Sequence, residues 1–183
     1  MNDRHESRLV LATVRERWDL VDRLMDEASP RPEVFLDVAR ECDVVPWIHA
    51  LLEVRGTPDR FGSEIADGLA AGRHKCRMDN LLLLARVEQA LDLMLAADIV
   101  PVALKGLDLM HRFDRGLDTR TLTDVDLLLR AEEVLRALDV LEEAGWILPP
   151  AERRPHWLRS SHHIPFSSAG PVEVEFEIHW NLV

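Results

Sequence analysis

The chain has 183 residues, enough for one large hydrophobic core or for two small units that share an interface. Hydrophobic residues make up 47% of it and charged residues 30%, as in an ordinary globular protein. The formal net charge is −11 and no basic stripe runs along the sequence, which argues against nucleic acid as a partner.

Cysteine usage and hydropathy exclude further classes. Cys42 and Cys76 are the only cysteines and form no CxxC pattern, so we expect neither a structural zinc site nor a disulfide framework. The first residues are polar and charged, unlike a signal peptide. The longest apolar runs, such as residues 81–85, are too short to span a bilayer. We therefore expect a cytoplasmic protein with no membrane partner.

The first hundred residues have the periodicity of helices. Apolar residues between positions 9 and 25 lie on one helical stripe, which a proline-containing segment at 29–32 interrupts. Pro32 suits the first position of a second helix, which continues through residues 34–39. A third helix is predicted over residues 45–54.

A fourth helical segment begins at Ser63, and residues 81–97 are strongly helical. Gly68 and Gly72 argue against one unbroken helix across this stretch, because glycine disfavours helix interiors. The pattern then changes, so we predict a helical N-terminal region over residues 1–97 followed by an α/β core.

Short β-like runs dominate residues 98–183. Strands are predicted over residues 99–104 and 125–129, separated by one or two helical turns at 107–113 and a loop at 114–120. The sequence therefore predicts an α+β fold with a mixed sheet and flanking helices.

The last part of the chain continues this alternation. An amphipathic helix is expected over residues 131–144, with Leu135, Leu138 and Leu141 on its buried face. Residues 149–155 have the composition of a turn or loop. A strand pair is predicted at the end, formed by residues 162–168 and 172–180.

Asp124 and Asp126 lie two apart in an otherwise apolar run. On a strand they share one face, with Cα atoms roughly 6.5–7 Å apart. Two such carboxylates repel each other and lose hydration, and a divalent cation between them removes both problems. The pair predicts a metal site. Its alternative is a strand end at which one acid caps a helix or pairs with an arginine.

A second acidic strand follows late in the chain. Glu173, Glu175 and Glu177 alternate and so share one face. That face could be the solvated side of an edge strand, which is our interpretation of Glu173. One glutamate beside the Asp pair would complete a three-carboxylate site of the kind that holds two Mg²⁺ for phosphoryl transfer. Glu177 is favoured, with Glu175 as the alternative register.

The run Leu104-Lys105-Gly106 ends the first predicted strand. A glycine between a strand and a helix lets backbone N–H groups approach phosphate oxygens closely. The helix N-terminus and the lysine add positive potential. Lys75 and Lys105 are the only lysines among 22 basic residues, which makes the one beside Gly106 noticeable.

Four histidines lie near the C-terminal end of the chain and, with the acids, suggest a hydrolase metal site as a further alternative: His156, His162, His163 and His179. No HExxH or comparable spacing supports that interpretation. His162 and His163 are adjacent, so on a strand they face opposite ways. His179 has the strand parity of Glu177, which places it near the predicted metals or on a backbone group.

As an ordered set, these motifs resemble the polymerase-β-like nucleotidyltransferase superfamily. More narrowly, the chain is similar to a group of largely uncharacterised bacterial nucleotidyltransferases. The likeness covers residues 75–183, and its matching motifs are Leu104-Lys105-Gly106, Arg120, Asp124-Val125-Asp126-Leu127-Leu128 and Glu177-Ile178-His179-Trp180.

The resemblance implies transfer of a nucleoside monophosphate (NMP) group from a nucleoside triphosphate (NTP) to a hydroxyl of a small-molecule or protein acceptor. Asp124, Asp126 and Glu177 would be the catalytic carboxylates and would hold Mg²⁺ or Mn²⁺. Glu177 would also help to deprotonate the acceptor. The acidic composition favours such an acceptor over nucleic acid.

Three further residues would bind the triphosphate in this interpretation: Lys105, Gly106 and Arg120. For Arg120 a salt bridge with nearby acids is the alternative. The chain departs from the superfamily at Leu107, where the turn usually has a serine whose hydroxyl helps to hold the triphosphate. The second hypothesis is therefore a non-catalytic nucleotide-binding or protein-interaction module, antitoxin-like, on the same scaffold.

Overall fold

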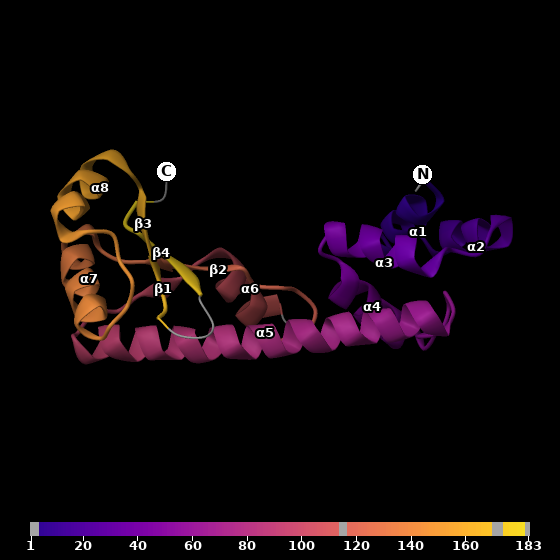
Figure 1. Ribbon diagram of the computed structural model, residues 1–183, viewed down its shortest axis with the longest axis horizontal. Coiled ribbons are helices and arrows are strands. Elements are labelled where there is room, and N and C mark those ends of the chain that lie inside the picture. Colours follow the sequence, from indigo (N-terminus) through magenta and orange to yellow (C-terminus); the bar gives the residue numbers. More distant parts are fainter. Residues whose placement is uncertain (1–3, 114–116, 170–173, 182–183) are drawn as a thin grey trace. The chain divides into compact units, whose positions relative to one another are not determined.

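The computed structural model describes residues 4–113, 117–169 and 174–181 (Figure 1). Contacts divide the chain into two compact units. The helical unit comprises Met1–Asp79 with Arg115–Thr121, and the sheet unit comprises Asn80–Asp114 with Leu122–Val183. Residues 80–97, which the sequence analysis grouped with the helical region, pack in the sheet unit.

The helical unit is built from α1 (Arg4–Val14), α2 (Trp18–Glu27), α3 (Pro32–Glu41), α4 (Val45–Arg55) and the first part of α5 (Ser63–Ala96). The predicted stripe over residues 9–25 divides into two helices, because the chain turns at Glu16 with a φ of 54°. Pro32 stands in the first turn of α3, as predicted. Gly56 ends α4 in the left-handed region, with a φ of 73°.

Helix α5 runs without interruption from Ser63 to Ala96, although Gly68 and Gly72, which count against an unbroken helix, lie inside it. A Cβ atom at these positions would collide with the side chains of Leu36 and Val45. The two glycines let α3 and the start of α4 pack closely on α5. This tertiary contact offsets the cost of about 1 kcal/mol that each glycine imposes on a helix.

One buried ion pair fastens α1 to the start of α3. The side chain of Glu6 is 3% exposed. Its two oxygens accept hydrogen bonds from Arg31, from Nε at 2.9 Å and from Nη2 at 3.0 Å, and the Arg31 backbone N–H adds a third at 3.2 Å. Hydrogen bonding to Arg31 lowers the pKa of Glu6 to about 2.

The sheet unit contains a mixed sheet with the strand order β1-β2-β4-β3. Its strands are β1 (Val102–Ala103), β2 (Asp124–Leu128), β3 (His163–Ser167) and β4 (Glu175–His179). The central pair, β2 and β4, is parallel, and the two outer pairings are antiparallel. The predicted α+β fold is confirmed, as is the pairing of the last two strands. Of the last predicted strand, residues 172 and 173 lie outside the described residues.

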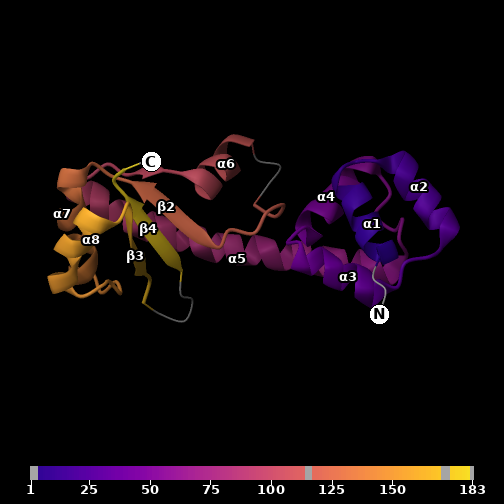
Figure 2. The same cartoon turned by 90° about the horizontal axis from the view of Figure 1, so that it is seen from above.

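One face of this sheet is the core of the unit. Alternate residues of the three longer strands are at most 3% exposed: Val125, Leu127, Ile164, Phe166, Phe176 and Ile178. They pack against the second part of α5 and against α7 (Val134–Glu143). Figures 1 and 2 both show α5 running along the sheet on this side. The opposite face is therefore left to the polar residues of the same strands.

Strand β1 and the buried face of α7 differ from the predictions. Strand β1 is shorter than residues 99–104, because Pro101 donates no ladder hydrogen bond and the chain turns at Lys105. Leu135 is 42% exposed, and Val134 and Ala137 lie in the core instead. A 3₁₀ turn at Ala131–Glu133 precedes α7 and shifts the phase of its apolar stripe.

The predicted loop at residues 149–155 contains a 3₁₀ turn (Ala151–Arg153) and the start of α8 (Arg154–Ser160). Arg154 explains this local order. It is buried, and its guanidinium contacts Asp139 at 3.3 Å and Glu142 at 2.6 Å, which ties α8 to α7. Among the helices of the described chain, none has the length and apolar character that a bilayer span requires.

Candidate active site

The polar face of the sheet collects the carboxylates that the sequence singled out. In the parallel pairing of β2 with β4, Asp124 lies opposite Glu175 and Asp126 lies opposite Glu177. Paired residues of neighbouring strands project to the same face. Asp124, Asp126 and Glu177 therefore share one face of the two central strands, with Glu175 beside them.

Asp126 is the buried centre of this face. Its side chain is 3% exposed, and one of its oxygens, Oδ1, accepts two hydrogen bonds. Lys105 Nζ donates to it at 2.6 Å and His179 Nε2 at 2.7 Å. A carboxylate only accepts, so the Nε2 atom of His179 carries the proton of this contact.

Lys105 is the first residue of α6 (Lys105–Phe113), and its side chain reaches Asp126. The backbone N–H of Leu104 donates to the carbonyl of Asp126 at 2.9 Å, which holds the chain beside β2 immediately before the turn. The turn itself has a φ of 45° at Lys105. The hydrogen bond to Asp126 raises the pKa of Lys105, and the nearby charges of Glu177 and Asp124 act in the same direction.

The predicted phosphate turn thus has Lys105 and Gly106 as the first two residues of α6. The left-handed conformation falls on the lysine, while Gly106 lies in the first helical turn. Helix α6 packs against β2 (Figure 2), so its N-terminal end starts beside the carboxylates. Unpaired N–H groups and a partial positive charge are general properties of such a helix end.

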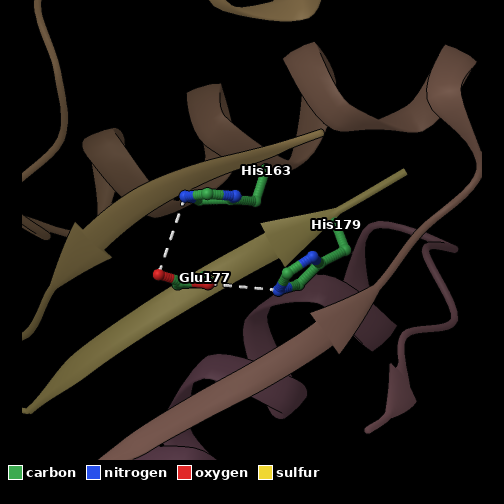
Figure 3. Close-up of side chains that lie close together, drawn as sticks. All are labelled: His163, Glu177 and His179. Carbon is green, nitrogen blue, oxygen red and sulfur yellow. Dashed lines mark ion pairs between the residues drawn. The ribbon is translucent and has the colours of Figure 1, made fainter. Parts of the chain in front are cut away.

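Glu177 lies between two imidazoles (Figure 3). Its Oε2 atom is 3.2 Å from His179 Nε2, and its Oε1 atom is 3.7 Å from His163 Nε2. From the sequence, His163 was named only in the alternative of a histidine-rich hydrolase metal site, and no motif spacing linked it to Glu177. Its place became visible only with the antiparallel register of β3 on β4, in which His163 lies directly opposite His179.

Asp124 and Glu175 form the exposed end of the face. The hydroxyl of Thr123 donates to Asp124 Oδ1 at 3.2 Å. A pocket of about 400 Å³ opens beside them and is also lined by Glu177 and Pro149. The register leaves both glutamates on the carboxylate face, but only Glu177 lies opposite the buried Asp126.

Arg120 is the sequence-predicted site residue that lies outside the sheet unit. It is exposed, and contacts place it in the helical unit, whereas the other candidates belong to the sheet unit.

A mixed sheet with carboxylates on two adjacent strands, and a lysine-bearing helix start beside them, has the layout of a nucleotidyltransferase-type α+β fold. The sequence profile of a protein family described as uncharacterised nucleotidyltransferase matches residues 28–183. The chain belongs to this family. The match begins at residue 28, whereas the likeness based on motifs covered residues 75–183. Most of the helical unit is therefore part of the family's common sequence. Comparison with curated proteins gave no match, and neither did comparison with solved structures.

Proposed function

We propose that the protein transfers an NMP group from an NTP to a hydroxyl of a small-molecule or protein acceptor, with Mg²⁺ or Mn²⁺ as cofactor. One observation carries the proposal. Asp126 and Glu177 are register partners on parallel strands, and Asp124 stands two residues away on the same face. Membership in a nucleotidyltransferase family supports the reaction class.

The donor set of this face fits a hard divalent cation. Three carboxylates from two rigid strands supply the oxygen ligands that Mg²⁺ and Mn²⁺ prefer: Asp124, Asp126 and Glu177. The same groups crowd negative charge around a side chain that is 3% exposed, with one lysine to offset it. When bound, the cations would neutralise phosphate charge and align the reacting oxygens.

Lys105 has a second role in this proposal. Its side chain is 60% exposed, and its ammonium group lies 2.6 Å from Asp126 Oδ1. An ammonium group is a compact point charge that binds phosphate as readily as carboxylate. We infer that Lys105 neutralises Asp126 in the free protein and turns to the triphosphate when the substrate binds. Gly106 and the first N–H groups of α6 would hold the same phosphates.

The acceptor would be activated by Glu177. This carboxylate is half-buried, and its Oε1 atom lies 3.7 Å from His163 Nε2. It can accept the hydroxyl proton of the acceptor as general base. His179 Nε2 donates to Asp126 Oδ1 at 2.7 Å and so helps to fix the orientation of that carboxylate. The exposed Arg120 is proposed as a bidentate phosphate ligand, which Arg120→Lys would impair.

The negative net charge of the protein favours one class of acceptor over another. A formal net charge of −11 repels a polyanionic backbone, so a small-molecule or protein hydroxyl is the better candidate than nucleic acid. The pocket of about 400 Å³ beside Asp124 and Glu175 is large enough for a small acceptor or for one side chain of a protein.

Label transfer from the NTP tests the proposal. Each of the four NTPs, labelled at the α-phosphate in one set and at the γ-phosphate in another, is incubated with Mg²⁺, protein, and small-molecule or protein fractions of a cell extract. We expect α-label in an acceptor and γ-label in pyrophosphate, with both signals lost in Asp126→Asn. Transfer of γ-label to the acceptor would instead show a kinase and contradict the assignment.

The alternative, a non-catalytic module, is favoured by one feature of the chain. Leu107 occupies the position after Gly106 at which the superfamily has a serine. A module of this kind would bind an NTP or a partner protein without releasing pyrophosphate. Binding that persists in Asp126→Asn, with no label transfer in any fraction, would favour it over the enzyme.

A further inference from the structure

Two histidines and one glutamate converge beside the proposed catalytic carboxylates. His163 on β3 lies directly opposite His179 on β4, and Glu177 precedes His179 by two residues on the same strand and face. Figure 3 shows Glu177 between the two imidazole rings. The ring centroids of the two histidines are 5.3 Å apart.

From this geometry we propose that His163, Glu177 and His179 form a separate site for a transition metal that prefers imidazole ligands, Zn²⁺ above all. One ligand atom from each of the three residues lies within 4.8 Å of the other two. Zn²⁺ binds nitrogen and oxygen at about 2.0–2.1 Å, which places the ligands of a tetrahedral site about 3.3 Å apart. The two oxygens of Glu177 lie close to this separation from the imidazoles, Oε2 at 3.2 Å from His179 Nε2 and Oε1 at 3.7 Å from His163 Nε2.

The donor set separates this site from the carboxylate site beside it. Two imidazoles and one carboxylate are the ligand set of many three-ligand zinc sites, which leave a fourth position for water or another group. Mg²⁺ prefers an octahedron of oxygen atoms and has little affinity for imidazole. The sheet thus offers two chemically distinct sites, which share strand β4 and its Glu177.

The surroundings provide both rigidity and access. The three ligands lie on two antiparallel strands whose register fixes their spacing. The side chains of His163 and Glu177 are 38% and 31% exposed, so an ion can reach them from solvent. His179 is 11% exposed, and its Nε2 atom lies 3.2 Å from Glu177 Oε2.

The two sites compete, because they share Glu177 and because His179 is both a zinc ligand and a hydrogen-bond donor to Asp126. His179 Nε2 cannot bind a metal and donate its proton to Asp126 at the same time. Glu177 bound to Zn²⁺ cannot serve as the base for the acceptor. We therefore expect Zn²⁺ to inhibit Mg²⁺-dependent transfer, a consequence that rests on the proposed function, whereas zinc binding itself does not.

Zinc binding is tested by competition with a chromogenic chelator, on tag-free full-length protein in metal-free buffer. We expect one Zn²⁺ per chain with a dissociation constant tighter than about 10 µM. His163→Gln and Glu177→Gln should weaken it more than about 100-fold, since loss of even an outer-shell partner costs 10–100-fold. His162→Gln is the matched control, because His162 is exposed and directly precedes β3. It should bind as the wild type does.

Co²⁺ provides a second measurement that does not depend on affinity alone. Tetrahedral Co²⁺ gives intense visible absorption bands, which should appear in the wild type and in His162→Gln and be absent from His163→Gln. Circular dichroism and melting curves establish that each variant is folded. Equal zinc affinity of wild type and His163→Gln, or wild-type binding weaker than about 10 µM, would overturn the site.

The effect of zinc on transfer activity distinguishes failure of the zinc site from failure of the proposed function. His163→Gln should retain Mg²⁺-dependent transfer and lose its inhibition by Zn²⁺. Zinc binding that depends on His163, in a protein without transfer activity, would leave the site standing and remove the proposed reaction. Transfer activity in a protein that binds no zinc would do the reverse.

Discussion

Within the described residues, Glu6 of the helical unit and Asp126 of the sheet unit both have side chains that are 3% exposed, and the two carboxylates are held in different ways. In the helical unit, both oxygens of Glu6 accept hydrogen bonds from the guanidinium and backbone of Arg31. In the sheet unit, one oxygen of Asp126 is shared by Lys105 and His179, among further acids.

The difference distinguishes a structural carboxylate from a functional one. The pairing of Glu6 is complete, and its pKa is lowered to about 2. The pairing of Asp126 leaves negative charge in excess, because Asp124 and Glu177 lie on the same face. Such an excess is relieved by binding cations. Substitutions at the two positions should therefore separate stability from activity.

The largest expected effect is that of Asp126→Asn on transfer. Loss of this carboxylate should lower the rate at least about 1000-fold, the upper range for removal of one preorganised electrostatic group. The asparagine oxygen can still accept from Lys105 and His179, so the free energy of unfolding should change by less than about 1 kcal/mol. Parallel rate and urea-unfolding measurements check both parts. A large loss of stability would make Asp126 a structural residue like Glu6.

The two glutamates of β4 should differ in effect. Glu177→Gln should slow transfer at least about 100-fold, as expected for loss of a general base. Glu175→Gln, its matched control on the same strand and face, should slow it less than about tenfold. Transfer rates of both variants at saturating NTP decide which glutamate is the third carboxylate. The reverse order would assign the third carboxylate to Glu175.

Glu6→Gln should lower the free energy of unfolding by about 1–3 kcal/mol, since it removes charge-assisted hydrogen bonds from a buried group. Transfer activity of the folded protein should not change. Because the pKa of Glu6 is lowered from 4.5 to about 2, its stabilisation is present above pH 4.5 and is lost as the pH falls toward 2. Unfolding curves of wild type and variant should therefore converge at acid pH. A constant difference down to pH 2 would contradict the role of this carboxylate.

The smallest effect is expected at Lys105. Lys105→Met removes the cation that competes for Asp126 and should increase Mg²⁺ affinity several-fold in the absence of nucleotide. The same variant should bind NTP about tenfold more weakly, a loss of 1.4 kcal/mol. Calorimetric titrations with each ligand measure the two effects. Weaker binding of both would show that Lys105 does not exchange between carboxylate and phosphate.

Much of the sheet unit could be predicted from sequence, because alternation along a strand has a period of two. That period alone placed Asp124 with Asp126 and Glu175 with Glu177. It could not supply the register of β3 on β4, which brings His163 to Glu177. A pairing shifted by one residue would have turned His162 to this face instead.

Other misses arose where tertiary contacts override local preference. The local preference of Gly68 and Gly72 counts against an unbroken helix, yet these glycines let α3 and α4 pack closely against α5. Leu135 read as buried, but the 3₁₀ turn before α7 moves Val134 and Ala137 into the core. The role of Arg120 stays a prediction, since this residue belongs to the helical unit and Asp124 to the sheet unit.

The most direct test of the account is a calorimetric titration of NTP in the presence of Mg²⁺ on wild type, Asp126→Asn and Glu6→Gln. We predict equal affinity for wild type and Glu6→Gln, and binding at least about 100-fold weaker for Asp126→Asn, a loss of about 2.7 kcal/mol. Equal affinity in all three proteins would contradict the assignment of the carboxylate face as the nucleotide site.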